Sequence, residues 1–404
     1  MQTNTEFSKG CQQVRGVPEK SVHRLSILMV VDGHYPATGG AEMQARLLSA
    51  SFAAEGHEVE VLAPHLDRSQ PTLERIDGIP VTRLAYPRIK GLGALMLNLR
   101  FAMWLLKRQH RFDAVHIHMM HNLAGAVGWL KPWLKPTVVG KVSGAAEFQG
   151  GILDPAHRHR LVHRLLLAGA LRLDAYQCIS RRTVNIMADA GFPSDRLHLV
   201  PNAVDLQRFR PPEQRDQNTL RAVFVGRHVP VKGLDVLLRA WALAKLPPGA
   251  RLTIAGDGPE RARLLALAKT LGIENEVDFP GLVHNVPALL AEHNLYVQAS
   301  HQEGLPNAVL EAMAAGLPVL ATHISGHEDI VVDDETGFLV PVGDPNAFAQ
   351  GLSKLASRAD LRECLGQAAR RFVETRYSTY AVMEALIKLY QGTASESQAQ
   401  SGQD

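Results

Sequence analysis

Two glutamates, Glu303 and Glu311, stand before and within one unusually apolar helix in the stretch EGLPNAVLEAMAAGLPVLATH. Pro306 suits the first helical position and Gly316 the position just after the last one, so the helix is predicted between them. A helix this apolar is buried, and a buried carboxylate needs a partner. The partner of Glu311 is therefore supplied either by the fold or by a ligand.

The turn before this helix has the features of an anion site. Its backbone N–H groups are free at Gly304, Leu305 and either Asn307 or Ala308. Pro306 has no N–H to donate, and the start of a helix attracts anions. Glu303 would repel a phosphate there unless its carboxylate faces hydroxyl groups, and Glu311 likewise suits a pair of sugar hydroxyls. A nucleotide-diphosphate sugar has phosphates flanked by polyols and meets these demands.

Two cations lie in the loop VGRHVPVKG, which is expected at the C-terminal end of a strand. Arg227 and Lys232 can together hold a diphosphate and stabilise it as a leaving group. Either cation alone is equally well explained as a solvated loop residue.

The stretch TGGAE carries a weaker phosphate signal at Gly39 and Gly40. Paired glycines before a helix let backbone N–H groups approach an anion. A plain tight turn explains this pattern about as well, and the third glycine of the dinucleotide-binding fingerprint is absent.

The segments that must position these residues alternate between strands and helices. In the N-terminal half, strands are predicted at 24–32, 56–64, 113–118, 136–143, 175–180 and 196–201. In the C-terminal half, the same alternation predicts strands within RAVFVGR, RLTIAGDG, EVDFPG, LYVQAS, PVLAT and GFLVP. This alternation predicts an α/β fold of two doubly wound, Rossmann-like domains that face each other across a cleft.

Shifts in composition give the predicted domain boundaries. They are a polar, disordered leader over 1–22, an N-terminal domain over 23–203, a linker over 204–219 and a C-terminal domain over 220–375. A helix at 376–391 is expected to pack back towards the N-terminal domain. The polar segment 392–404 is expected to be a disordered tail.

The composition is that of a globular protein: 404 residues, 46% of them hydrophobic and 21% charged. Three cysteines show no pairing or metal-binding pattern, and the first 22 residues lack the apolar core of a signal peptide. The apolar window from Gly93 to Leu106 is too short to span a bilayer and is expected to be a buried or interfacial helix. A cytoplasmic protein is the expectation.

Positive charge is concentrated between Val81 and Arg172, where fourteen Lys and Arg residues face three Asp and Glu residues. This segment is either a solvated basic face or a surface for anionic lipid or a phosphorylated acceptor. No motif or aromatic pattern for nucleic acid accompanies it, so nucleic acid is not expected as a partner.

Several stretches resemble the retaining GT-B glycosyltransferases of family 4, also called glycosyl transferases group 1. In the C-terminal half they are VGRHVPVKGLDVLLRA, IAGDGPER, FPGLV, EGLPNAVLEAMAAGLPVLAT and VDDETGFLV. In the N-terminal half they are PATGGAEMQ, GHEVEVLAP and VPNAVDLQRF. The resemblance covers most of residues 25 to 390 and is looser between about Val81 and Arg172. It implies that the N-terminal domain receives the acceptor and that the C-terminal domain binds a nucleotide-sugar such as a UDP-sugar.

The resemblance also implies roles for individual residues. Arg227 and Lys232 match the cations that hold the donor diphosphate. Glu303 matches the glutamate that touches the donor sugar, and Glu311 matches the one that takes the ribose hydroxyls. The remaining donor contacts that it implies are Gly39 and Gly40 near the distal phosphate, the helix start from Gly304 to Asn307, and the backbone of Leu282 and Val283 at the nucleobase.

The chain departs from the family near the transferred sugar. Many relatives have a histidine after the strand that corresponds to VVGKVS, whereas this chain has Ser143 there and Glu147 shortly after. Either residue is a candidate for a sugar or acceptor contact. His116 and His118 are further candidates, although a histidine at a strand end is more often structural.

These observations predict a retaining glycosyltransferase that moves a sugar from a nucleotide-diphosphate sugar to a glycan or glycolipid acceptor, with polysaccharide or lipopolysaccharide assembly at the cell surface as its expected role. No metal and no cofactor beyond the co-substrate are expected, since no Asp-x-Asp motif ends a strand. An anionic membrane surface, on the inner face of the cytoplasmic membrane, is a candidate partner. The alternatives are a nucleotide-sugar epimerase of GT-B fold and a non-catalytic sugar-nucleotide-binding subunit.

Overall fold

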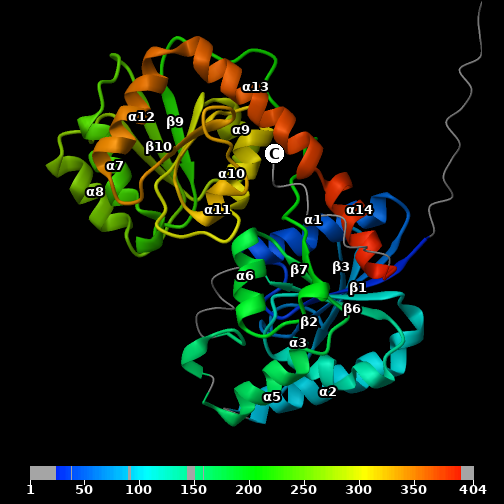
Figure 1. Cartoon of the computed structure of the whole chain (residues 1–404). Helices are drawn as coiled ribbons and strands as arrows, with labels where there is room; N and C mark the ends of the chain where they lie inside the picture. The colour runs from blue at the N-terminus through cyan, green and yellow to red at the C-terminus, as the bar shows by residue number, and fades with distance from the viewer. Residues whose placement is uncertain (1–23, 38, 90–91, 143–150, 158, 393–404) are drawn as a thin grey trace, which may run out of the picture.

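The computed structural model describes residues 24–37, 39–89, 92–142, 151–157 and 159–392. These residues form two α/β domains, each built on one sheet with helices on both faces (Figure 1). The predicted fold class, two Rossmann-like domains, is confirmed.

The N-terminal domain holds an eight-stranded sheet in the order β3-β4-β2-β1-β5-β6-β7-β8. Its strands are β1 (Ser26–Val31), β2 (Glu58–Pro64), β3 (Leu73–Ile76), β4 (Ile79–Leu84), β5 (Ala114–His118), β6 (Thr137–Val142), β7 (Ala175–Cys178) and β8 (Leu197–Leu199). Its helices are α1 (Gly40–Ala54), α2 (Leu92–Arg108), α3 (Asn122–Leu130), α5 (Leu161–Ala170) and α6 (Arg181–Asp189).

All neighbouring strands of this sheet are parallel except β3 and β4, which form an antiparallel hairpin. The hairpin is absent from the predicted strands. Its turn is Asp77-Gly78, where both residues have positive φ, 51° and 80°, the backbone of a two-residue hairpin turn. β3 lies at the sheet edge with Leu73 70% exposed, so it lacks the apolar run that marks the buried strands.

The C-terminal domain holds a six-stranded, fully parallel sheet in the order β11-β10-β9-β12-β13-β14. Its strands are β9 (Arg221–Val225), β10 (Arg251–Ala255), β11 (Val277–Gly281), β12 (Leu295–Gln298), β13 (Val319–Thr322) and β14 (Gly337–Val340). Its helices are α7 (Leu234–Leu243), α8 (Arg261–Thr270), α9 (Val286–Ala291), α10 (Asn307–Ala314), α11 (Ser325–Glu328), α12 (Pro345–Ser357) and α13 (Ala359–Arg376).

Each sheet is buried on both faces, as parallel sheets require. In β1, the neighbouring residues Val30 and Val31 are fully buried and belong to apolar clusters on opposite faces. In β9 of the C-terminal domain, Val223 and Phe224 are likewise fully buried and belong to apolar clusters on opposite faces. The central strands therefore read as continuous apolar runs in the sequence.

The last helix links the two domains. α13 packs against α10 in the C-terminal domain, whereas α14 (Thr379–Tyr390) packs against α1 in the N-terminal domain (Figure 1). At the end of α14, the hydroxyl of Tyr390 lies 2.7 Å from Nδ1 of His116 on β5. The chain thus crosses twice between the domains, once in each direction.

Helix α2 covers the apolar window for which a buried or interfacial helix was expected. Leu97, Phe101 and Leu105 are buried against the sheet. The opposite face carries large apolar side chains that are about half exposed or more, including Leu95, Leu99 and Met103. Among the residues that the structure describes, no helix has the length and apolar character needed to cross a bilayer.

Candidate active site

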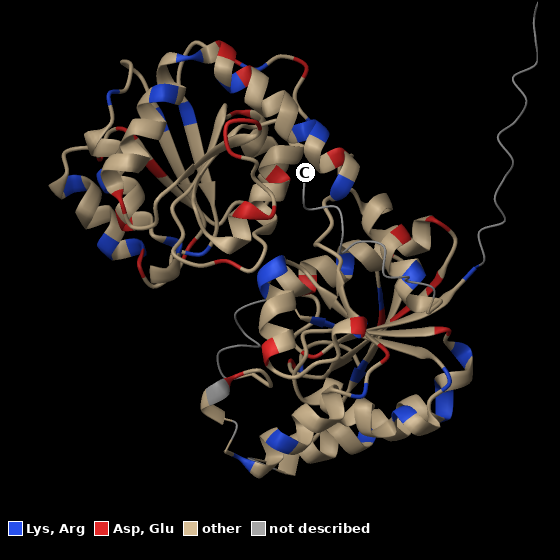
Figure 2. Ribbon diagram, viewed as in Figure 1, with Lys and Arg blue, Asp and Glu red and all other residues tan. Residues whose placement is uncertain are grey.

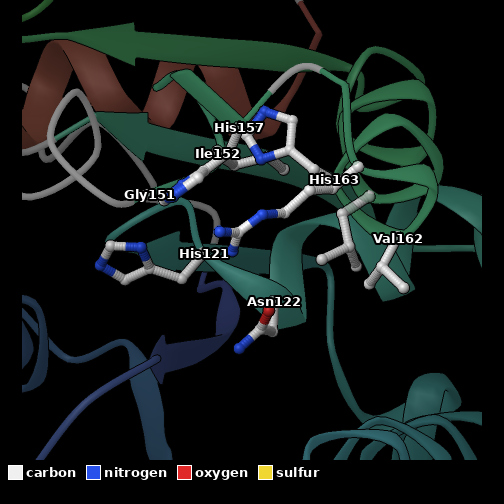
Figure 3. Close-up of a pocket in the computed structure, with 9 residues that line it drawn as sticks. His121, Asn122, Gly151, Ile152, His157, Val162 and His163 are labelled. Atoms are coloured by element: carbon white, nitrogen blue, oxygen red, sulfur yellow. The ribbon is translucent and has the colours of Figure 1, made fainter. Parts of the chain in front are cut away.

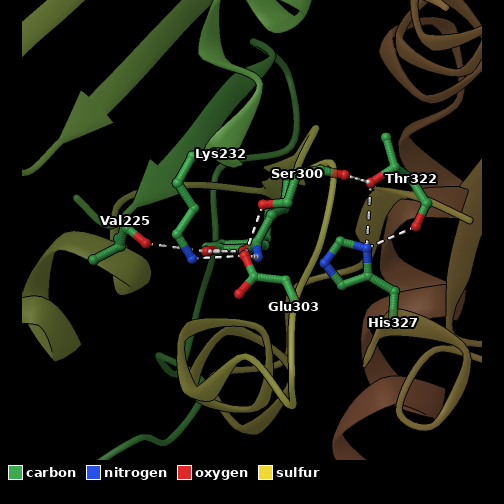
Figure 4. Close-up of polar contacts among 8 residues, drawn as sticks. Val225, Lys232, Ser300, Glu303, Thr322 and His327 are labelled. Carbon is green, nitrogen blue, oxygen red and sulfur yellow. Dashed lines mark hydrogen bonds and ion pairs between the residues drawn. The ribbon is translucent and has the colours of Figure 1, made fainter. Parts of the chain in front are cut away.

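The carboxylate of Glu303 is held by three donors on a single oxygen atom (Figure 4). Lys232 Nζ donates to Oε1 at 2.6 Å, Gln298 Nε2 at 2.8 Å and Ser300 Oγ at 2.7 Å. Within the described part of the chain, Oε2 accepts no hydrogen bond. The side chain is therefore fixed in position and keeps one oxygen available for a ligand.

The backbone next to Lys232 explains why this cation reaches Glu303. Lys232 ends a single 3₁₀ turn after β9, and Gly233 follows with a φ of 60°. A Cβ on Gly233 would lie 2.1 Å from the carbonyl oxygen of Ala299, just after β12. Only glycine lets the two loops approach this closely, so the loop after β9 packs onto the segment that carries Glu303.

Glu311 lies on α10 and is half-buried. No described residue donates a hydrogen bond to its carboxylate, and burial raises its pKa to about 7, opposed by the positive charge of Arg208. A buried carboxylate with no donor is costly when ionised. The described fold thus does not supply the partner that the sequence requires.

Helix α10 begins one residue later than predicted. Pro306 has an extended backbone, with φ of −75° and ψ of 111°, and is the cap residue, so the first helical residue is Asn307. The prediction that placed Pro306 at the first helical position is therefore wrong by one residue. Gly316 has a φ of 75° just beyond the helix end, as predicted.

Asn307, at the start of α10, joins the two domains. Its Nδ2 donates to the carbonyl oxygen of Gly40 at 3.2 Å, and its Oδ1 accepts from Asn202 Nδ2 at 2.8 Å. Gly39 and Gly40 lie at the start of α1, which follows β1. The structure therefore brings the glycine pair of one domain against the helix start of the other, while Thr38 lies outside the described residues.

The remaining predicted donor contacts lie at the same edge of the C-terminal sheet. Arg227 follows β9 and is exposed, without an ion pair to any carboxylate of the described chain. Leu282, 72% exposed, and half-buried Val283 follow β11 at the end of the sheet. All of these positions follow the C-terminal ends of parallel strands, where ligands bind in this class of fold.

The structure does not place the two candidate histidines of β5 at the surface. His116 and His118 are fully buried, with ring centroids 4.5 Å apart, and His116 contacts Tyr390. Burial lowers the pKa of His116 to about 3 and that of His118 well below its usual value. The structure favours the structural interpretation of both residues. Ser143 and Glu147 lie outside the described residues.

Three residues of the site were missed by the sequence analysis. Gln298 and Ser300 hold Glu303, and no local pattern distinguishes them from other polar residues at a strand end. The third is His327, which is buried beside the same turn (Figure 4). Its Nδ1 lies 2.7 Å from the carbonyl oxygen of Thr322, and burial lowers its pKa to about 4, so the ring is neutral.

Comparisons with known proteins match both halves of the chain. The model for Glycosyltransferase Family 4 matches residues 38–208, and the model for glycosyl transferases group 1 matches residues 205–372. A D-inositol 3-phosphate glycosyltransferase of Streptomyces avermitilis is 30% identical over 381 residues, which cover 84% of this chain and 81% of that protein. The chain belongs to glycosyltransferase family 4. It is a glycosyltransferase of GT-B fold.

A second curated protein and a solved structure are also similar to this chain. An N-acetyl-alpha-D-glucosaminyl L-malate synthase of Bacillus anthracis is 24% identical, covering 88% of this chain and 94% of that protein. The crystal structure of Anabaena HepE in complex with UDP has a TM-score of 0.75 at 19% identity and covers 91% of this chain and all of that one. At this identity, HepE shows the shared fold alone.

Proposed function

We propose that this glycosyltransferase moves a sugar from a nucleotide-diphosphate sugar to an acceptor with retention of the anomeric configuration. The observation that carries the proposal is the paired charge at the start of α10. Lys232 and Glu303 are 2.6 Å apart there, and Asn307 of the same turn contacts Gly40 of the N-terminal domain. A cation, a helix start and a fixed carboxylate close together suit a diphosphate joined to a sugar.

The proposed mechanism uses no side-chain nucleophile. The bond between sugar and diphosphate breaks, and the leaving diphosphate assists the incoming acceptor hydroxyl on the same face of the sugar. Lys232, Arg227 and the free N–H groups before α10 stabilise the negative charge that grows on the diphosphate. The open oxygen of Glu303 faces the sugar, where positive charge grows. Glu311 takes the ribose hydroxyls, which supply the donors that its carboxylate lacks.

The solved structure of HepE with UDP supports a uridine nucleotide as the proposed donor base. The acceptor is proposed to be a glycan or glycolipid of the cell surface. The names of two relatives give inositol 3-phosphate and malate as acceptors, and both are anions. An anionic group on this chain's acceptor fits the excess of basic residues between Val81 and Arg172.

We also propose that the N-terminal domain rests on an anionic membrane. The exposed face of α2 presents Leu92, Leu95, Leu99 and Met103 at helical spacing. The helix has no acidic residue and ends in Lys107 and Arg108. In Figure 2, the ribbon of α2 and α5 is blue at several Lys and Arg positions. Apolar residues beside basic ones are typical of helices that lie in the headgroup region of anionic lipid.

A donor screen tests the proposed function. The purified chain is incubated without acceptor with a panel of UDP-, GDP-, ADP- and TDP-sugars, and the products are identified by mass spectrometry. We expect slow release of UDP and free sugar from one donor, abolished in Lys232→Met. An epimerase would convert a donor without releasing nucleotide. Nucleotide binding without release or conversion would indicate the non-catalytic alternative.

A further inference from the structure

His327 is fully buried beside the turn that carries Glu303 (Figure 4). It lies on α11, the short helix after β13 in the C-terminal domain. Its surroundings differ from those of His121 and His157, which line a cavity of about 310 Å³ in the N-terminal domain (Figure 3). The proposed mechanism assigns no role to His327, although burying a polar ring is costly. The contacts of the ring indicate its role.

The hydrogen bonds of His327 fix its tautomer. Nδ1 lies 2.7 Å from the carbonyl oxygen of Thr322, the last residue of β13. Burial lowers the pKa of His327 to about 4, so the ring is neutral and carries a single proton. A carbonyl oxygen only accepts, so this proton is on Nδ1. Within the described chain Nε2 has no hydrogen-bond partner, and the ring therefore acts on its neighbours through Nδ1–H.

Thr322 links the ring to the loop that carries Glu303. The pairing of β12 with β13 ends at Gln298, so the loop beyond it needs other contacts to hold it. The hydroxyl of Thr322 supplies one, because it donates to the carbonyl oxygen of Ser300 at 2.6 Å. Ser300 Oγ in turn donates to Glu303 Oε1 at 2.7 Å. Thr322 and Ser300 are both fully buried, so water does not compete for these bonds.

Helix α11 supports the same turn through its backbone. A Cβ on Gly326 would lie 2.8 Å from Cβ of Glu303 and 2.9 Å from the carbonyl oxygens of Glu303 and Gly304. Because only glycine allows this approach, the position of α11 sets the position of the turn. The helix has four residues, too few to be stable alone. The bond from His327 to Thr322 ties it to the sheet.

We propose that His327 is a positioning residue of the glycosyl transfer: its Nδ1–H holds Thr322 and α11, and these hold the Glu303 carboxylate where the donor sugar requires it. The inference rests on the proposed function, because Glu303 is assigned to the sugar there. His327 itself touches neither the donor nor the acceptor. A change at His327 therefore acts on the reaction through Glu303.

Two substitutions separate the hydrogen bond of His327 from the volume of its ring. His327→Phe keeps an aromatic ring and removes the donor, whereas His327→Asn loses the ring and keeps an N–H donor at the place of Nδ1. For the donor identified by the screen, His327→Phe should lower kcat about tenfold with KM for the donor within about twofold of the wild type. His327→Asn should keep kcat within about threefold. Full activity in His327→Phe with a loss in His327→Asn would assign the ring to packing alone and overturn the proposal.

The loss of kcat should also depend on Glu303. In a Glu303→Ala background, His327→Phe should lower kcat by less than about twofold more, because the carboxylate that the ring positions is already gone. The same tenfold loss in both backgrounds would show that His327 acts independently of Glu303 and would overturn the proposal.

His293→Phe is the matched control. The ring of His293 is also buried, with Nδ1 2.6 Å from the carbonyl oxygen of Leu289, but it precedes β12 at the opposite end of that strand from Glu303. This variant should lower Tm as His327→Phe does and leave kcat unchanged. A similar fall of kcat in both variants would reduce the effect to lost stability and contradict the proposal.

Amide hydrogen exchange tests the positioning without any turnover. Peptides that cover residues 299–305 should exchange about fivefold faster in His327→Phe, whereas His327→Asn should match the wild type. Peptides of the N-terminal domain should be unchanged in both variants. Unchanged exchange over 299–305 in His327→Phe would overturn the proposal. A wild type that turns over no nucleotide-sugar would instead contradict the proposed function, and the exchange result would still decide whether His327 positions the turn.

Discussion

At the scale of single residues, Glu303 and Glu311 have opposite surroundings. Glu303 has three donors on one oxygen, whereas Glu311 has none among the described residues. A ribose contact is made equally in ground and transition states, so Glu311→Ala should raise KM for the donor at least tenfold with kcat nearly unchanged. In the proposed mechanism Glu303 faces growing positive charge, so Glu303→Ala should lower kcat by about 10²–10³-fold.

The control for this kinetic comparison is Glu328→Ala, an exposed glutamate of the same domain that pairs with His323. It should leave both constants unchanged. Melting temperatures of all three variants separate a lost contact from a lost fold. Equal losses of kcat in two well-folded variants, with KM for the donor unchanged, would show that the division of roles is wrong.

The pKa of Glu311, raised by burial to about 7, predicts a pH dependence of donor binding. If ribose hydroxyls donate to the ionised carboxylate as proposed, UDP affinity should rise about tenfold between pH 6 and pH 8 as the free protein loses this proton. Glu311→Gln has no titrating group at this position. UDP itself titrates equally with both proteins, so comparing their affinities removes the contribution of UDP. Calorimetry at pH 6, 7 and 8 would contradict this assignment if both proteins changed equally.

The raised pKa of Glu311 also affects the stability of the ligand-free protein. Because the folded pKa of about 7 exceeds the usual value of 4.5, the native state binds the proton more tightly than the unfolded state. The free energy of unfolding should therefore fall as pH rises through this range. A bound donor, which favours the ionised form, opposes this loss.

At the scale of elements, the proposed membrane contact depends on helix α2. Leu99 and Met103 are 51% and 55% exposed on its outer face. The double variant Leu99→Glu with Met103→Glu should lose at least ninety per cent of its sedimentation with phosphatidylglycerol vesicles, because about 1.5–3 kcal/mol of apolar burial is removed for each side chain. Leu243→Glu, at a site 56% exposed in the other domain, is the matched control.

For this membrane proposal, the wild type should also prefer phosphatidylglycerol to phosphatidylcholine vesicles at low salt. The basic end of the helix, Lys107 and Arg108, supplies that preference and should be screened by added salt. Equal recovery with neutral and anionic vesicles would end the proposal.

Buried strands were predictable from sequence because each is a continuous apolar run, as in β1 and β9. The hairpin of β3 and β4 was not, since an edge strand with Leu73 exposed carries no such run. The proposed donor residues come from motifs in the sequence, as for Glu303. The contacts that fix it could not, because Lys232, Gln298 and Ser300 meet only when separate strands align in the sheet.

The packing of α3 against α5 shows the same limit. A Cβ on Gly128 would lie 1.8 Å from the carbonyl oxygen of Gly169, so this close approach needs glycine. Neither glycine stands in a motif that would predict which helices meet.

At the scale of the whole molecule, the two domains meet at the point where the donor is proposed to bind. Asn307 contacts Gly40 and Asn202 of the N-terminal domain, and the N–H of Arg181 on α6 donates to Asp329 after α11 at 3.2 Å. Helix α14 then returns the chain to the N-terminal domain. These contacts support the proposed arrangement, in which the donor residues and the acceptor side face each other for direct transfer.

The most direct test of this account is the anomeric configuration of the sugar that the enzyme releases to water. The donor identified by the screen is hydrolysed in an NMR tube, and the anomeric proton is followed before the free sugar can mutarotate. Front-face assistance by the leaving diphosphate predicts that the first sugar to appear has the configuration of the donor. First appearance of the opposite anomer would contradict the retaining mechanism and, with it, the roles assigned to Lys232 and Glu303.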